Sequence, residues 1–426
     1  MSVRTALLVV FVVLLVAALG VVLGVTCSKS HAIDKDLDYK AVKTFPPLSN
    51  FVSSLNTLYD PYSNSNTPLV VPMTWDEDEG AYMITLSING MWIPLVFDSG
   101  SSHISAKGLQ CQWKQCDNNN NCTITSCPKT EAYIPRGPQV SLNLATKSTL
   151  EYGSQKSHVT HHLEPFALFD TRPNCADLAR LGPSGFQHVS QYMNELYPTG
   201  APLVTFGPTL LYSIYSIEGT TTSNIFGMAQ DSDSAQPAVL DALFPKLKSK
   251  VDDAAANQVW SITCYPSHCM FALGALRCGP APVKFVPLLR PAEFKKFLTL
   301  FYTVKLHSVL VNNKKVKSAA LPKFVILDTG TTYTYCSQTF KDGLTKAGYK
   351  PGQTSVTLVL GNSLNTVSLQ YKPSQLQNAF VTELSDMESM FNQTPVLLLG
   401  IEQMFYFYWE YNLREQMLGV APLLPL

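Results

Sequence analysis

Short alternating runs of hydrophobic and polar residues dominate this sequence and predict a protein built mostly of β-strands. The run from 82 to 88 leads directly into an Asn-Gly pair at 89–90, which is typical of a strand entering a tight hairpin turn. The run from 356 to 360, followed by Gly-Asn at 361–362, has the same form. Helical periodicity is scarce, and the segment 239–251 is the best candidate for a helix.

The longest apolar run lies near the N-terminus, at residues 6–25. At about 1.5 Å per residue, a helix of this length spans about 30 Å, the thickness of a bilayer core. Residues 1–26 are therefore predicted to be a transmembrane signal-anchor, with a cleaved signal peptide as the alternative. Both interpretations deliver the rest of the chain to the secretory pathway, as a single-pass membrane protein with a lumenal or extracellular domain, or as a secreted one.

Charge balance, composition and length limit the classes of protein to which this chain can belong. Lys plus Arg and Asp plus Glu balance at 31 each, so the basic footprint of a nucleic-acid-binding protein is absent from the composition. Hydrophobic residues make up 46% and charged residues 15%, which is a globular composition with fewer charges than usual. The length of 426 residues allows two or three domains.

One motif occurs twice, and it carries the candidate chemistry. An apolar strand ending in Asp-Ser-Gly-Ser-Ser at 98–102 returns 230 residues later as Asp-Thr-Gly-Thr-Thr at 328–332. An Asp at the end of a buried strand is costly to desolvate unless it is hydrogen-bonded, and the adjoining hydroxyls can supply such bonds. Two copies, one in each half of the chain, predict a duplicated fold that brings Asp98 and Asp328 face to face.

Two adjacent carboxyls suit the hydrolysis of a peptide bond without a metal or a Ser or Cys nucleophile. They cannot easily both ionise, so they share one proton. The ionised partner can take a proton from water, and the protonated partner can polarise the scissile carbonyl. The alternative is a coincidence of two ordinary strand-to-turn Asp residues.

From about residue 69 to the end, the chain resembles the two-lobed aspartic proteases of the pepsin family. In that family a later apolar-apolar-Gly strand passes behind each catalytic loop, and the segments 225–227 and 398–400 fit this role. Further segments that are similar to the family's strands are 260–262, 271–274, 302–306, 405–411 and 418–422. The resemblance implies a mostly β, bilobal fold with the active-site cleft between an N-terminal lobe (68–279) and a C-terminal lobe (280–426).

The resemblance also assigns roles to individual residues. Asp98 and Asp328 would be the catalytic pair, and the motif residues around them would support it: Ser99, Gly100 and Ser101 in the first loop, and Thr329, Gly330 and Thr331 in the second. Ser101 and Thr331 would hydrogen-bond the outer carboxyl oxygens, while Ser99 and Thr329 would brace the loops against each other. Tyr152 and Gly153 would belong to the hairpin flap that closes over substrate.

The sequence departs from the family pattern around the flap. The family usually has a Trp seven residues after the first Asp, and this chain has Ser105 there. The flap tip usually reads Gly-x-Gly, but no second Gly follows Gly153. Residues 27–67, rich in Ser, Asn and Pro with interspersed Lys, are predicted to be a membrane stalk, with an inhibitory prosegment as the alternative that the family offers.

The cysteines agree with an oxidising compartment. Cys111, Cys116, Cys122 and Cys127 are clustered after the first motif, and the resemblance implies a small Cys111–Cys116 disulfide loop there. A zinc site is the alternative, although the spacing has no Cys-x-x-Cys pair. Without Cys27 the chain has nine cysteines, so one thiol would be free or paired between chains.

Two smaller features are a group of histidines and two possible N-glycosylation sites. His158, His161 and His162 could bind metal or sense pH, but a solvated polar strand is the preferred interpretation. The triplets 121–123 and 392–394 have the form of N-glycosylation acceptors, and Pro395 makes the second the weaker candidate.

These observations predict a monomeric aspartic endopeptidase that hydrolyses a peptide or protein substrate with a water activated between Asp98 and Asp328. We expect no cofactor, no metal and no nucleic-acid partner, and contact with the membrane through the N-terminal segment. The alternative is a catalytically silent pepsin-like ectodomain that binds peptides or proteins in the cleft.

Overall fold

The computed structural model describes residues 69–423 with internal gaps, the longest of which are 170–202, 245–257 and 382–394. The segments expected to be the signal-anchor or signal peptide (1–26) and the stalk or prosegment (27–67) lie outside the described residues. Within the part of the chain that the structure describes, no helix is long and apolar enough to cross a membrane.

The described residues are mostly β-strand, as the alternating pattern predicts. The strands of the first half are β1 (Leu69–Asp76), β2 (Ala81–Ile88), β3 (Met91–Asp98), β4 (Ile104–Cys116), β5 (Cys122–Ser126), β6 (Lys147–Tyr152), β7 (Gln155–Phe169), β8 (Leu203–Gly219), β9 (Ile225–Gly227), β10 (Val259–Tyr265) and β11 (His268–Leu273). The later strands are β12 (Lys284–Pro287), β13 (Tyr302–Val311), β14 (Lys314–Lys315), β15 (Phe324–Leu327), β16 (Val356–Gly361), β17 (Thr366–Tyr371), β18 (Val396–Leu399), β19 (Phe407–Asn412) and β20 (Met417–Pro422). The helical elements are α7 (Gln338–Lys346), α9 (Ile401–Met404), η3 (Ser318–Ala320) and η4 (Pro373–Leu376).

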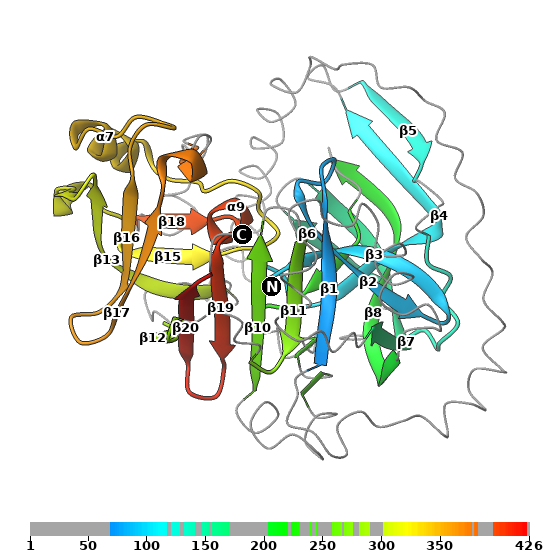
Figure 1. Ribbon diagram of the computed structural model, residues 1–426. Coiled ribbons are helices and arrows are strands. Elements are labelled where there is room, and N and C mark those ends of the chain that lie inside the picture. Colours follow the sequence, from blue (N-terminus) through cyan, green and yellow to red (C-terminus); the bar gives the residue numbers. More distant parts are fainter. Residues whose placement is uncertain are drawn as a thin grey trace, which may run out of the picture.

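Among the described residues these strands form two sheets. The larger has 14 strands in the order β12-β20-β19-β10-β11-β1-β2-β3-β9-β4-β8-β7-β6, with β5 paired to β4. The smaller has six, in the order β17-β16-β13-β15-β18, with β14 paired to β13. Figure 1 shows β1, β10, β11, β19 and β20 standing side by side in the middle, with the smaller sheet on one side and β2–β8 on the other. The last two strands of the chain thus extend the sheet of the first half.

The predicted hairpins are confirmed. β2 and β3 are joined by Asn89 and Gly90, whose φ angles of 53° and 78° explain the choice of Asn-Gly. β16 and β17 pair from Val356 to Gly361, and Gly361 has a φ of 108°. Both turns depend on residues that tolerate the left-handed region, which is why they can be read from sequence.

The helical predictions are only partly met. Residues 239–240 and 243–244 are helical and buried, and the rest of 239–251 lies outside the described residues. Helix α7 is not among the predicted elements, and it is capped by the Ser337 hydroxyl, which accepts from the Phe340 amide. Its inner face consists of Phe340 and Leu344 alone, too short a pattern to stand out from sequence.

The predicted Cys111–Cys116 loop is wrong. The structure pairs Cys111 with Cys127 and Cys116 with Cys122, two rungs across the β4–β5 hairpin. Cys111 and Cys116 both lie on β4, where five residues of extended chain separate them by about 16 Å, far beyond the reach of a disulfide. Because all four thiols are consumed, the zinc alternative is wrong as well.

Two further cysteine findings concern the later half of the chain. Cys264 and Cys269 form a third disulfide that joins β10 to β11. Cys336 is a buried free thiol, in agreement with the odd count. Cys27, Cys175 and Cys278 lie outside the described residues.

The interpretation of 158–162 as a solvated strand is wrong for two of its three histidines. His161 and His162 are 1% and 9% exposed. β7 lies between β6 and β8, and His161 packs edge-on against Tyr212 of β8 with its Nε2 2.7 Å from the Ser148 hydroxyl. Across the described residues, no group of three or more His, Cys, Asp or Glu side chains is placed to hold a metal ion.

A buried carboxylate on β7 fixes the loop after the β4–β5 hairpin. Glu164 accepts hydrogen bonds from Asn89 Nδ2 (2.7 Å), the Tyr133 hydroxyl, and the amides of Arg136 and Gly137 (2.7 Å each). Burial opposes its ionisation, but these donors together lower the pKa of Glu164. The ionised carboxylate is therefore a structural anchor that ties this loop to the β2–β3 turn.

Glu164→Gln should destabilise the protein by about 2–4 kcal/mol, because the Gln amide group cannot accept all four donors and leaves some of them buried and unpaired. Urea unfolding would measure this. The pKa is lowered in the folded state, so the stabilisation is present above the ordinary value of 4.5 and is lost as pH falls through the folded pKa. The difference between wild type and variant should therefore shrink in acid.

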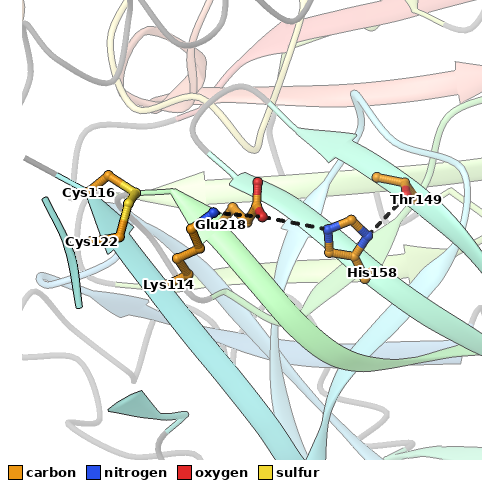
Figure 2. A network of polar contacts seen from close by, with 6 residues as sticks. All are labelled: Lys114, Cys116, Cys122, Thr149, His158 and Glu218. Atoms are coloured by element: carbon orange, nitrogen blue, oxygen red, sulfur yellow. Dashed lines mark hydrogen bonds and ion pairs between the residues drawn. A yellow bond between two sulfur atoms is a disulfide. The ribbon is translucent and has the colours of Figure 1, made fainter. Parts of the chain in front are cut away.

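Glu218→Gln is the matched control. Glu218 Oε1 lies 3.4 Å from Lys114 Nζ and 4.0 Å from His158 Nε2, in the network shown in Figure 2 beside the Cys116–Cys122 disulfide. Both charged partners in the Lys114 pair are about 40% exposed, so the change should cost less than about 0.5 kcal/mol. Equal losses for the two variants would contradict the anchoring role of Glu164.

Candidate active site

Each Asp motif begins where a buried strand ends, and each strand has a short parallel partner. β3 pairs with β9, with Asp98 opposite Gly227, and β15 pairs with β18, with Leu327 opposite Leu399. The segments 225–227 and 398–400 therefore pass behind the two loops, as the resemblance implied. The strand residues before each Asp, Phe97 and Leu327, are about 1% exposed or less.

Gly227, the last residue of β9, and Gly400, the residue after β18, are both required by close approach. A Cβ on Gly227 would lie 2.5 Å from the Ser101 carbonyl oxygen, and one on Gly400 would lie 2.7 Å from the Thr331 carbonyl oxygen. The backbone contacts explain this proximity, since the Gly227 amide donates to the His103 carbonyl and the Ile401 amide donates to the Thr331 carbonyl. Each Asp loop is thus held against a glycine from behind.

Ser99 and Thr329 join the two loops reciprocally. The Ser99 amide donates to Thr329 Oγ1 (2.8 Å), and the Thr329 amide donates to Ser99 Oγ (3.0 Å). Each hydroxyl then donates across to the other strand, Ser99 to the Leu327 carbonyl (3.1 Å) and Thr329 to the Phe97 carbonyl (2.8 Å). These four buried hydrogen bonds link residues 228 to 232 positions apart and hold the two strand ends together.

The bracing brings the two carboxyls into contact. A Cβ on Gly100 would lie within about 3 Å of an oxygen of both Asp98 and Asp328, so the two carboxyls meet at this glycine. Each carboxyl also accepts from the glycine amide two positions later, at 2.7 Å from Gly100 and 3.0 Å from Gly330. A Cβ on Gly330 would lie 2.5 Å from Asp98 Oδ1, and one on Gly100 would lie 2.9 Å from Asp328 Oδ1. Both motif glycines are therefore needed for the carboxyls to meet.

Burial raises the pKa of both carboxyls, and the negative charge of Asp98 raises the pKa of Asp328 further, to about 7. Hydrogen bonds from Thr331 and Gly330 oppose this rise without cancelling it. Two adjacent buried carboxyls cannot easily both ionise, so the raised pKa values favour a pair that keeps one proton.

The hydroxyls outside the pair are not equivalent. Thr331 Oγ1 donates to Asp328 Oδ2 over 2.6 Å. The matching Ser101 hydroxyl is buried beside Asp98 and opposes the rise of its pKa, but its Oγ makes no hydrogen bond of standard geometry to a described residue. Asp98 is 9% exposed, and Asp328 keeps more of its surface open.

The predicted flap segment is a hairpin. β6 and β7 pair in antiparallel register from Lys147 opposite Thr160 to Tyr152 opposite Gln155. Gly153 and the side chain of Tyr152 lie outside the described residues. Ser105, which stands where the family has Trp, is fully buried on β4 and opposite Tyr212 of β8.

Two supports of the site were not predicted from the sequence. The Met228 amide donates to the Asp98 carbonyl (2.7 Å), and the Met228 carbonyl accepts from the Tyr302 hydroxyl (2.5 Å). The Thr332 hydroxyl donates to the Gly80 carbonyl (2.7 Å) and ties the second loop to the β1–β2 turn. Tyr302 lies in a segment that was predicted to be a strand, but no sequence pattern indicates that its hydroxyl donates to the Met228 carbonyl.

Comparison with known proteins gives no independent assignment: no protein-family model and no curated protein matches this chain. The candidate site is therefore defined by the geometry of its own residues.

Thr329→Val should lower the free energy of unfolding by about 2–4 kcal/mol, because it removes two buried hydrogen bonds and leaves the Ser99 amide and the Phe97 carbonyl without them. Urea unfolding would measure the loss. Thr366→Val, on the exposed face of β17, is the matched control and should change stability by less than about 0.5 kcal/mol. A Thr329 variant as stable as the control would mean that the cross-links do not hold the strand ends together.

Proposed function

We propose that this protein is an aspartic endopeptidase of the pepsin-like kind, with Asp98 and Asp328 as its catalytic pair. The observation that carries the proposal is the meeting of two carboxyls at the motif glycines, each directly after a buried strand. Such a pair can supply a base and an acid at once, which the addition of water to an amide carbonyl requires.

In the proposed mechanism Asp98 is the base, and Asp328, whose pKa is raised to about 7, is the acid. Asp98 takes a proton from the attacking water, whose oxygen forms a bond to the scissile carbonyl carbon. Asp328 gives its proton to the carbonyl oxygen, so a neutral tetrahedral diol forms. The diol then collapses as its C–N bond breaks: Asp98 gives its proton to the leaving nitrogen, and Asp328 takes a proton from a diol hydroxyl, so the pair again carries one proton on Asp328.

The proposed architecture is bilobal, with the cleft between the lobes. It is supported by the placement of the loops, since β3 precedes the first Asp in the larger sheet and β15 precedes the second in the smaller one. The β6–β7 hairpin is the proposed flap, with Tyr152 and Gly153 at its tip covering an extended peptide. The disulfides favour a lumenal or extracellular location for this catalytic part, and a membrane tether through 1–26 belongs to the same proposal.

A protein that only binds peptides would fit the same fold. That alternative is disfavoured because both motifs keep their Asp and Gly, and because burying two carboxyls together costs free energy that a binding site alone does not require. Cleavage of a peptide library by the purified full-length protein, with and without pepstatin, distinguishes the two functions.

Asp98→Asn and Asp328→Asn should each lower kcat by at least about 1,000-fold, because Asn keeps the shape but can neither accept the water proton nor share the acid proton. Asp342→Asn is the control, since Asp342 lies on the exposed side of α7 and accepts from Gln338. Thermal unfolding of all three variants would show that the fold is retained. Retention of more than a few per cent of wild-type kcat in either variant of the pair would refute the proposed function.

The pH dependence of kcat/KM should be bell-shaped. As pH rises through about 7, Asp328 loses the proton that polarises the carbonyl, and the rate falls. As pH falls, Asp98 becomes protonated and can no longer act as the base. A pH–rate profile measured on one peptide substrate tests this, and a rate that keeps increasing up to about pH 9 would be incompatible with a shared proton.

A further inference from the structure

The β6–β7 hairpin carries one histidine on each of its two faces, and each histidine contacts a hydroxyl of β6. On the inner face, His161 Nε2 lies 2.7 Å from the Ser148 hydroxyl. On the outer face, His158 Nδ1 lies 3.2 Å from the Thr149 hydroxyl, a contact that Figure 2 shows. His161 is 1% exposed, whereas the His158 side chain is 27% exposed. The two pairs thus have the same chemistry in different surroundings.

The inner histidine connects the two strands that flank β7. Towards β6 it contacts Ser148, and towards β8 it packs edge-on against Tyr212, with ring centroids 5.3 Å apart and planes at 77°. His161 and Tyr212 are directly opposite each other in the β7–β8 register. Tyr212 itself lies in a buried cluster with Leu150 of β6 and Val159 of β7. His161 therefore links the edge of the hairpin to the core beneath it.

From Tyr212 the contacts continue to the first Asp loop. The Tyr212 ring lies 4.9 Å, centroid to centroid, from the ring of His103, the residue that directly follows the motif at 98–102. The His103 carbonyl accepts from the Gly227 amide (3.0 Å), which belongs to the strand behind that loop. A continuous line of contacts thus joins the hairpin to the loop that holds Asp98. We call its four members the hairpin anchor: Ser148, His161, Tyr212 and His103.

The hydrogen bond is the part of the hairpin anchor that an apolar residue could not supply. Among the described residues, β6 is the last strand of the larger sheet and pairs only with β7. A strand with one neighbour has backbone hydrogen bonds along one edge alone. A buried side-chain hydrogen bond adds about 1 kcal/mol to its attachment, and a Phe at position 161 would pack against Tyr212 without making it.

We propose that His161 is a positioning residue that fixes the β6–β7 hairpin against the first Asp loop, through Ser148 on one side and through Tyr212 and His103 on the other. The proposal rests on the proposed function, in which this hairpin covers the substrate. A hairpin held at its base keeps its tip in one place, and close positioning of the substrate favours both binding and reaction. His161 acts through the hairpin and is not itself a catalytic residue.

Two substitutions at this position separate the hydrogen bond from packing. His161→Phe keeps a ring against Tyr212 but loses the bond to Ser148, whereas His161→Gln is the poorer core residue but carries an amide that can replace Nε2. Steady-state kinetics on one peptide should show KM raised about 5–20-fold in His161→Phe, with a smaller change in kcat, and KM within about 3-fold of wild type in His161→Gln. A residue needed only to fill the core would give the reverse order, with Phe tolerated better than Gln, and that order would overturn the proposal.

His158→Phe is the matched control. It removes the same kind of contact, to Thr149, from the outer face of the same hairpin, together with the 4.0 Å approach of His158 Nε2 to Glu218. Because this pair is exposed to water and does not connect the hairpin to Tyr212, KM should stay within about 2-fold of wild type. An equal rise in KM for His158→Phe and His161→Phe would mean that the hairpin anchor has no special part in positioning.

Hydrogen exchange of the full-length protein gives a readout that does not need activity. The amides of β6 and of β7 up to Thr160 should exchange about 5-fold faster or more in His161→Phe than in wild type and His161→Gln, while those of β16 and β17 stay unchanged. This result supports the anchoring of the hairpin even if wild type cleaves no peptide, which would refute the proposed function instead. A wild type that cleaves peptides, together with unchanged hairpin exchange in His161→Phe, would overturn the positioning role and leave the proposed function standing.

Discussion

The reciprocal hydrogen bonds between Ser99 and Thr329 are the constraint on which the rest of the site depends. Two carboxyls repel each other when both are charged, and each loses hydration when buried, so nothing in the pair itself would draw the loops together. The hydroxyls fasten each loop to the carbonyl that precedes the opposite Asp. Once the strand ends are joined in this way, burial and the charge of Asp98 raise the pKa of Asp328 and favour a pair that keeps one proton.

The two loops have nearly the same sequence, yet they surround their carboxyls differently. Thr331 donates a short hydrogen bond to Asp328, while Ser101 makes none of standard geometry to Asp98. Behind the first loop the Met228 amide and carbonyl connect Asp98 to Tyr302, and nothing equivalent appears behind the second among the described residues. An acid and a base can therefore arise from one repeated motif, because their neighbours, rather than the motif, set the proton affinities.

What the sequence could predict was local. The motif, the Asn-Gly turn at 89–90 and the apolar-apolar-Gly strands are written in consecutive residues, and the structure contains each of them. The pairing of Cys111, the burial of His161 and the contact of Tyr302 with Met228 depend on which strands become neighbours in the sheet, and no short pattern encodes strand order. The disulfide that the family resemblance implied is wrong for the same reason. The spacing of the cysteines does not show that Cys111 and Cys116 lie on one strand, where they cannot reach each other.

The placement of β19 and β20 has a consequence for how the molecule is made. β10 finds its neighbour in β19, and roughly 140 residues of chain separate the end of one from the start of the other. At a synthesis rate of about 5–20 residues per second, the edge of β10 that pairs with β19 stays unpaired for on the order of ten seconds during synthesis. Pairing between strands so far apart in the sequence makes folding slow, and it cannot occur before the later strand has been synthesised. Asp328 itself is synthesised 230 residues after Asp98, so a ribosome-bound chain that ends between them carries the first half of the pair without its second.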